Sequence, residues 1–335
     1  METAYTAARE RAAWLDRSSR GRIVVSGADR RSYLQGLLTN DIDALTPGTG
    51  CYAAYLTAQG RMIADMWVYE VGDVILLVAH GDVNATLLAR LDQFIFSEDV
   101  QLGDVTATFA AIAVVGPKAS DAVSRVLTGA SAAALEALPV HGNMRATFAS
   151  TAAIVTRTTD VGEPGFDIYF AADEREAFVA ALAAAGVAAL DVDTAEVLRV
   201  EAGVPLFHRD MDEETIPLEA GLDSRAISFT KGCYVGQEVI IRVLHRGHGR
   251  VAKRLVQLAV DGRVVPERLA AIEAGDKIVG AVTSAVYSPR LNQPIALGYV
   301  QRDVAEPDTI VRINSSSAGG NDSAAISARV TQRIS

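Results

Sequence analysis

Hydrophobic and polar residues follow the same plan in two parts of the chain. In each part an apolar β-branched run leads to a glycine and then to an amphipathic stretch, at residues 23–38 around Gly27 and at residues 112–127 around Gly116. The apolar run predicts a strand, and the helical spacing of the apolar residues after it predicts a helix, with Asp29 as a suitable N-cap in the first copy. The repeat therefore indicates two related α+β halves.

The segments between and after these units also carry strand and helix patterns. Residues 52–80 predict a meander of strands with turns at "AQG" and "VGD". Asp82 is expected to cap the next helix, and a helix that follows the strand "GFDIYF" is expected to stop at Gly186. Asp193 and Glu196 have the spacing of a capping box and predict the start of a further helix.

The pattern changes after about residue 250. Short apolar runs separated by turn residues, such as "VAKRLVQLAV" and "IALGYV", predict an all-β segment that forms a small barrel or sandwich. We therefore divide the chain into residues 1–249, which hold the two α+β subdomains, and residues 250–335, which form a C-terminal barrel-like domain.

Composition restricts the classes of function. The 335 residues suffice for two or three domains, and a formal net charge of −10 argues against binding to a nucleic-acid backbone. The two cysteines, Cys51 and Cys233, fit neither a disulfide framework nor a zinc finger and favour a reducing compartment. Neither a signal peptide nor a membrane-spanning run is expected, so the sequence predicts a cytoplasmic protein without membrane or nucleic-acid partners.

Two acidic residues are candidates for ligand contacts. Asp65 lies in the alternating stretch "GRMIADMWVY", where Ile63 and Trp67 share its face. Burial beside them would raise the pKa of Asp65 and strengthen a hydrogen bond to a ligand amine. Glu163 lies in a Gly-Glu-Pro-Gly turn that can present one side chain into a cleft. The alternatives are an exposed strand aspartate and an exposed turn glutamate.

The stretch "SFTKGCYVGQEVIIRVLHRGHGR" is the most specific motif in the chain. Apolar residues with helical spacing follow Cys233, so this cysteine is expected at or near a helix N-terminus. The helix macrodipole and Lys231 would there favour the thiolate over the thiol. The alternative is an inert buried cysteine, because cysteine is among the most buried residue types.

A basic run extends from Arg242 to Arg254 and holds seven basic or titratable side chains within 13 residues. In an acidic protein this run could concentrate an anion, or it could be a solvated linker. His245 and His248 alone do not define a metal site, because no matching cysteine or histidine lies nearby in the sequence.

Several blocks of the sequence resemble a known family. This is the folate-binding family that contains the T-protein of the glycine cleavage system, an aminomethyltransferase, and the YgfZ proteins of iron–sulfur metabolism. The similar blocks, in the family's order, are "GRIVVSGADRRSYLQGLLTNDI", "QGRMIADMWVY", "RTTDVGEPGFDIYF", "VLRVEAGVPLFHRDMDEETIPLEAGL" and "VTSAVYSPRLNQPIALGYV". The motif "KGCYVGQE" resembles the YgfZ branch.

The resemblance implies an α+β protein. Two partly interleaved α+β domains and a C-terminal all-β barrel-like domain would form a three-domain ring around a central tetrahydrofolate site. The resemblance places Asp65 beside the reactive nitrogens of folate and Glu163 on the pterin. Cys233 is the residue associated with the YgfZ role. Asp65 and Cys233 are therefore the catalytic candidates. The further cofactor-binding candidates are Arg199, Lys231, Tyr234, Gln237, Glu238 and Arg242.

Two positions depart from the T-protein pattern. Asp160 stands where T-proteins have a tyrosine, and Ala195 stands where they have a folate-contacting arginine. Arg199 remains nearby, and the basic run that begins at Arg242 could supply charge for the glutamate tail of folate.

The first functional expectation is therefore a YgfZ-like tetrahydrofolate-binding protein that supports the assembly or repair of iron–sulfur enzymes, with those enzymes or assembly proteins as clients. Two cysteines cannot build a four-thiolate cluster site, so a cluster would be handled transiently or by partner proteins. The second reading is a tetrahydrofolate-dependent aminomethyltransferase, which the presence of Asp65 favours. The third is a scaffold that has lost folate.

Overall fold

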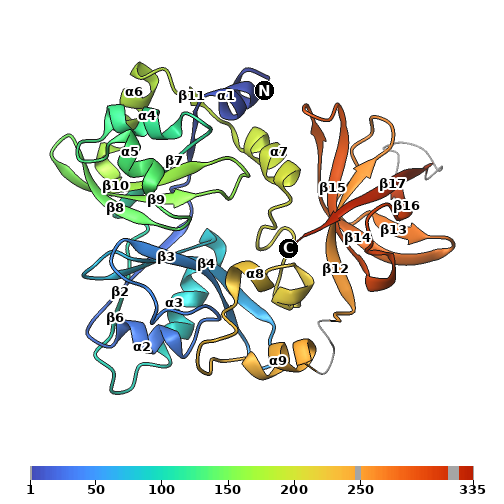
Figure 1. The fold of residues 1–335 in the computed structure, drawn as a ribbon, viewed down its shortest axis with the longest axis horizontal. Helices are drawn as coiled ribbons and strands as arrows, with labels where there is room; N and C mark the ends of the chain where they lie inside the picture. Colours follow the sequence, from blue (N-terminus) through green and yellow to red (C-terminus); the bar gives the residue numbers. More distant parts are fainter. Residues whose placement is uncertain (1, 246–249, 316–323, 335) are drawn as a thin grey trace. The chain divides into compact units, whose positions relative to one another are not determined.

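The computed structural model describes residues 2–245, 250–315 and 324–334 (Figure 1). The chain forms two compact units by its internal contacts. The first unit consists of Met1–Leu56, Ile63–Ala195 and Ala226–Val235, and the second of Thr57–Met62, Glu196–Arg225 and Gly236–Ser335. No helix in the described ranges is both long enough and apolar enough to cross a bilayer.

The first unit contains a five-stranded sheet in the order β3-β4-β5-β2-β6. Its strands are β2 (Gly21–Ser26), β3 (Thr49–Leu56), β4 (Met62–Glu70), β5 (Ile75–Ala79) and β6 (Gln101–Asp104), and its helices are α2 (Arg30–Gln35) and α3 (Asn84–Asp92). Tight turns at residues 57–61 and 71–74 are closed by backbone hydrogen bonds, which confirms the predicted meander and its two turns.

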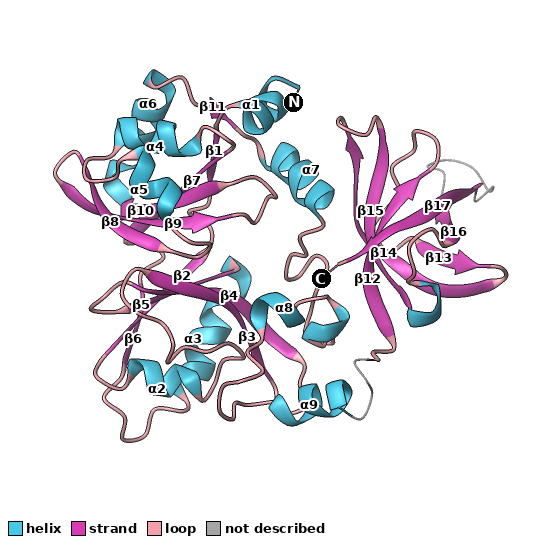
Figure 2. Ribbon diagram, viewed as in Figure 1, coloured by secondary structure: helices cyan, strands magenta, loops and turns pink. Residues whose placement is uncertain are grey.

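A six-stranded sheet in the order β11-β1-β7-β10-β9-β8 lies in the same unit. Its strands are β1 (Ala13–Asp16), β7 (Phe109–Val115), β8 (Asn143–Phe148), β9 (Thr151–Thr158), β10 (Gly165–Ala171) and β11 (Ala188–Ala189), and its helices are α1 (Glu2–Glu10), α4 (Ala119–Val126), α5 (Ala132–Ala137) and α6 (Arg175–Ala184). Helices α4, α5 and α6 gather over this sheet (Figure 2) and share with it an aromatic core of Phe148, Phe170 and Phe178.

Strand β1 shows how the two sheets interleave. It precedes every strand of the five-stranded sheet in the sequence, yet it pairs with β7 of the six-stranded sheet, for example Trp14 with Val114. The chain thus starts one sheet, leaves to build the other, and returns. The expected interleaving of two α+β domains is confirmed. Helix α1, in contrast, was not predicted from the sequence.

Gly27 and Gly116 hold equivalent positions in the two sheets, at the turn from strand to helix. Both have positive φ, 103° and 122° respectively. A Cβ on Gly27 would lie 2.0 Å from the backbone oxygen of Asp99, and one on Gly116 would lie 2.7 Å from that of Ala8. Only glycine fits such a backbone and such close approaches. The repeated strand–glycine–helix pattern is therefore confirmed.

The predicted helix caps are only partly right. Asp82 lies in a 3₁₀ turn, η1 (Gly81–Val83), so it does not cap α3. Helix α7 (Val192–Ala202) is capped by Asp191, whose carboxylate accepts a hydrogen bond from the backbone N–H of Thr194 at 2.8 Å, and not by the box expected at Asp193. Helix α6 does stop as expected, because Gly186 follows it with a φ of 77°.

The second unit contains a closed barrel in the order β12-β15-β14-β13-β16-β17, with all neighbouring pairs antiparallel. Its strands are β12 (Lys253–Val260), β13 (Ala271–Ala274), β14 (Lys277–Ser288), β15 (Gln293–Gln301), β16 (Ile310–Ser315) and β17 (Ala324–Arg333). Alternate residues such as Val256 and Leu258 fill the interior. The predicted all-β segment is thus a barrel. Helix α9 (Gln237–His245) also lies in this unit, whereas α7 and α8 (Asp223–Ala226) each span both units.

We expect Gly27→Ala to destabilise the protein by more than about 2 kcal/mol, because it combines an unfavourable positive φ with a clash against backbone. Gly72→Ala is the matched control, since Gly72 has a φ of 110° but no heavy atom within 4 Å of an added Cβ. It should cost about 1 kcal/mol. Urea unfolding measures both, and equal losses would show that the approach of Asp99 is unimportant.

Candidate functional site

Asp65 lies in the middle of β4 on the face that also carries Ile63 and Trp67. The carboxylate is buried, with the residue only 8% exposed, and it accepts a hydrogen bond from the hydroxyl of Tyr52 on β3. Burial raises the pKa of Asp65 above its ordinary value of 3.8, although the Tyr52 hydroxyl acts in the opposite direction. The burial and the direction of the pKa shift predicted from its neighbours are confirmed.

Four charged side chains form a group that we call the ion cluster: Arg17, Asp160 and Asp167, which are buried, and Arg20, which is partly buried. Arg17 donates to Asp160 and to Asp167, each at 2.7 Å, and Arg20 donates to Asp160 at 2.6 Å. Burial alone would raise the pKa of Asp160, but the two guanidinium groups hold it below its ordinary value. Burial raises the pKa of Asp167. Asp160, which departs from the T-protein pattern, is therefore an ionised partner of two arginines.

The ion cluster reaches the surroundings of Asp65 through aromatic side chains. The guanidinium carbon of Arg20 lies 4.6 Å from the centre of the Trp67 ring. Trp67 in turn packs against Tyr52, with ring centres 5.6 Å apart and planes inclined by 48°. Since Tyr52 donates to Asp65, a continuous series of contacts joins Arg20 to the Asp65 carboxylate.

Glu163 lies in the turn before β10 and forms an ion pair with Arg9 of α1. The Glu163 side chain is only 12% exposed, and Arg9 is 20% exposed. Arg9 also lies 5.5 Å from the ring centre of Tyr5. The alternative of an exposed turn glutamate is therefore wrong, because an N-terminal helix covers this carboxylate.

Lys231 has a structural position. Its ammonium group donates to the backbone oxygens of Gln35, Leu38 and Asn40, at 2.6, 2.6 and 2.9 Å. These three bonds use all three donors of a lysine. The buried Tyr234 ring lies 5.1 Å from the same ammonium. Burial lowers the pKa of Lys231 to about 8.

Cys233 is exposed and lies four residues before the first residue of α9. The predicted helix is therefore present, but Cys233 lies outside its first turn, where the macrodipole would act. The Lys231 ammonium is bound to backbone oxygens, so it does not serve as the expected thiolate partner. The alternative of an inert buried cysteine at this position is also wrong.

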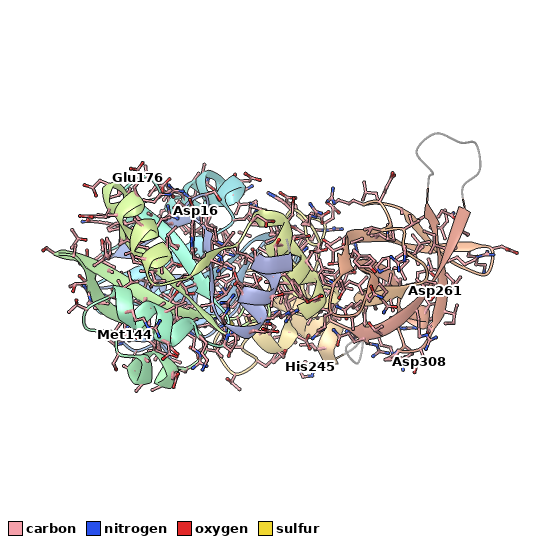
Figure 3. All side chains as sticks on the ribbon, turned by 90° about the horizontal axis from the view of Figure 1, so that it is seen from above. Asp16, Met144, Glu176, His245, Asp261 and Asp308 are labelled. Carbon is pink, nitrogen blue, oxygen red and sulfur yellow. The ribbon has the colours of Figure 1, made fainter. Side chains whose placement is uncertain are left out.

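The later residues of the motif lie on α9. Gln237 is its first residue and half-buried, while Glu238 and Arg242 form an exposed ion pair with 2.8 Å between their charged atoms. His245 is the last residue of this helix (Figure 3). Within the predicted basic run, residues 246–249, which include Arg246 and His248, lie outside the described residues.

Arg199 is engaged within the second unit. Its guanidinium donates to Glu196, Asp210, Ser284 and the backbone oxygen of Val204. These contacts occupy the five N–H donors of an arginine. We therefore leave Arg199, Lys231 and the Glu238–Arg242 pair out of the proposed ligand contacts, because contacts inside the protein account for each of them.

A cavity of about 220 Å³ lies between the two sheets of the first unit, between β2 and β5 on one side and β9 and β10 on the other. Its walls are largely apolar, with Tyr169 and Ile154 among them, and Arg22 lies beside them. Asp65 and Glu163 are not among its lining residues, so this cavity is not the candidate site.

The two α+β sheets with a C-terminal barrel have a counterpart among solved structures. The crystal structure of glycine cleavage system aminomethyltransferase T from Bartonella henselae matches 98% of this chain and 88% of its own, with a TM-score of 0.86 at 21% identity. This likeness concerns the fold.

Sequence comparisons define the family. Residues 1–231 match the GCVT N-terminal domain and residues 253–332 match the glycine cleavage T-protein C-terminal barrel domain. The chain is 31% identical over 315 residues to an aminomethyltransferase of Synechocystis sp., covering 91% of this chain and 82% of the relative. It is 32% identical over 300 residues to one of Rubrobacter xylanophilus, covering 90% and 79%. This chain belongs to the glycine cleavage T-protein family.

The first functional expectation, a YgfZ-like protein that supports iron–sulfur enzymes, is wrong. The relatives that align over nine tenths of the chain are named aminomethyltransferases, and these matches support neither the YgfZ branch nor iron–sulfur clients. The short motif "KGCYVGQE" is thus a weaker indicator of function than the longer blocks that the chain shares with these relatives. Tetrahydrofolate as the one-carbon carrier agrees with membership in this family.

Lys231→Met should destabilise the protein by about 2–4 kcal/mol, because three buried or partly buried hydrogen bonds to backbone oxygens would lose their charged donor. Arg242→Met is the control, since it removes a cation from an exposed i,i+4 pair and should change stability by less than about 0.5 kcal/mol. Urea unfolding of both variants tests this. A loss as small as that of the control would contradict the structural role of Lys231.

The pH dependence of stability should report the buried Asp65 carboxyl. The pKa of Asp65 is raised in the folded state. The protonated carboxyl therefore contributes to stability fully below pH 3.8, and this contribution is lost as the pH rises through the folded pKa. The unfolding free energy of Asp65→Asn minus that of the wild type should therefore increase as the pH rises from 3.8 through the folded pKa of Asp65.

The control for this measurement is Asp73→Asn, which changes a carboxylate that is 71% exposed and paired with Arg145. Its difference from the wild type should stay nearly constant over the same pH range. A difference for Asp65→Asn that falls as the pH rises would contradict the direction given above.

Proposed function

We propose that this protein is a tetrahydrofolate-dependent aminomethyltransferase. One observation carries the proposal: a chain whose relatives are aminomethyltransferases over nine tenths of its length has a buried carboxylate, Asp65, with Tyr52 as its hydrogen-bond donor. A structural carboxylate in such a position would be costly, because burial disfavours its charged form. Its presence there favours a role in catalysis.

Asp65 is suited to stabilising positive charge. Transfer of the aminomethyl carbon from the sulfur of a lipoyl carrier to tetrahydrofolate breaks its C–S and C–N bonds, releases the carrier thiol and ammonia, and develops positive charge at the reacting atoms. A carboxylate held at a fixed position in a desolvated site stabilises that charge more strongly than a solvated one. Tyr52 engages Oδ2 of Asp65, and we propose Oδ1 as the oxygen that faces the folate nitrogen.

Glu163 is the proposed contact for the pterin. Arg9 engages Oε1 of this carboxylate, which fixes its orientation. We propose that Oε2 accepts a hydrogen bond from a pterin N–H group. On this view α1 orients a binding residue, and Arg9 contributes to folate affinity without touching folate.

Asp65→Asn should lower the rate of methylene-tetrahydrofolate formation by about 10²-fold or more, because it removes the charge that stabilises the transition state. Cys233→Ser should retain the wild-type rate, since Cys233 is exposed and has no assigned step. The assay supplies an aminomethyl-loaded lipoyl carrier protein and tetrahydrofolate and measures single-turnover rates.

The outcomes separate the remaining readings. Tetrahydrofolate binding by calorimetry without any turnover in the wild type would contradict the proposed enzyme. No heat and no thermal shift with tetrahydrofolate would favour the scaffold that has lost folate. A Cys233→Ser variant that loses activity while Asp65→Asn keeps it would reverse the assignment of the catalytic residue.

A further inference from the structure

The ion cluster reaches the surroundings of the proposed catalytic carboxylate through Arg20 and Trp67, and it has no part in the function so far assigned. We propose that Arg20 and Asp160 are positioning residues for Asp65: Asp160 holds Arg20 against Trp67, where the guanidinium places a positive charge in the surroundings of the Asp65 carboxylate. This inference rests on the proposed function, because it assigns to Asp65 the role given there.

The contacts support a directed arrangement. Arg20 is held by Asp160 at 2.6 Å, and its guanidinium carbon lies 4.6 Å from the centre of the Trp67 ring. Trp67 packs on Tyr52, and the Tyr52 hydroxyl donates to Asp65. A planar guanidinium fits this place better than an ammonium, because it can pair with a carboxylate and stack on an indole at the same time.

The composition of the cluster indicates that it is more than packing. Two guanidinium groups and two carboxylates lie together, and Arg17, Asp160 and Asp167 are each less than 9% exposed. Apolar residues of similar size are often at least as stable in such places, because burying charges costs desolvation. Arg20 is the member that extends from this group to Trp67.

The charged and titratable groups around Asp65 come from three elements. Tyr52 comes from β3, His80 follows β5, and Arg20 comes from the connection between β1 and β2. Each of them favours the ionised form of Asp65 against burial. Behind Arg20 lie the carboxylates of Asp160 and Asp167 and the guanidinium of Arg17, so the field of Arg20 at Asp65 is partly compensated.

These signs predict opposite effects of two substitutions. If the ionised carboxylate is the active form, the rate falls as the pH falls through the pKa of Asp65. Arg20→Met removes a positive charge and should shift this fall in rate, the acid limb of the pH–rate profile, to higher pH by roughly half to one pH unit. Asp160→Asn removes a negative charge and should shift the acid limb to lower pH.

The experiment measures the pH dependence of single-turnover rates for the wild type and both variants. Arg20→Lys keeps the charge and should leave the limb near its wild-type position, and Tyr52→Phe should move it up because it removes the donor. Arg145→Met is the control for loss of an exposed arginine of the same unit and should not move the limb. Shifts of the same sign in Arg20→Met and Asp160→Asn, or no shift in either, would overturn the inference.

A second measurement does not depend on activity. The difference in unfolding free energy between Asp65→Asn and its parent is compared in the wild-type and Arg20→Met backgrounds at neutral pH. A larger difference in the Arg20→Met background is expected, and equal differences would overturn the inference. If the wild type shows no turnover but this coupling is found, the proposed function fails while the electrostatic link between Arg20 and Asp65 stands.

Discussion

The crossing of the chain between two sheets is the constraint on which the first unit depends. Strand β1 belongs to the six-stranded sheet and β2 to the five-stranded sheet, so residues 17–20 must connect them. Arg17 and Arg20 lie in this connection and pair with Asp167 of β10 and with Asp160 of the turn between β9 and β10. The connection is thereby fixed by ion pairs, and one of its arginines, Arg20, also contacts Trp67 in the surroundings of Asp65.

Local patterns in the sequence predicted much of the fold. The two strand–glycine–helix units follow from neighbouring residues, and the position of Asp65 follows from alternation along one strand. The pairing of Arg17 with Asp160 joins residues 143 positions apart, and Lys231 binds the backbone oxygen of Gln35 across 196 positions. No local pattern reports such contacts. One sequence signal for such a contact is a charged residue inside an apolar strand, such as Asp167 in "GFDIYF", because a buried charge needs a partner.

The expectation of a YgfZ-like function is wrong for a physical reason. The motif around Cys233 is distinctive in sequence, but several of its residues make structural contacts within the protein. Lys231 holds backbone oxygens, Tyr234 packs beneath its ammonium, and Glu238 pairs with Arg242 on the surface of α9. A short conspicuous motif can therefore reflect the needs of the fold, whereas Asp65 stands out only when its burial is considered.

The three hydrogen bonds of the Lys231 ammonium to backbone oxygens, here called the Lys231 clamp, bear on the expression of part of this protein. The matched N-terminal family domain ends at residue 231, but the compact first unit extends to Val235 and includes the Tyr234 ring beside the lysine. A gene fragment truncated at the domain boundary would place its new carboxylate terminus on the clamping residue itself. A fragment that ends at Val235 or later retains both Lys231 and the Tyr234 ring beside it.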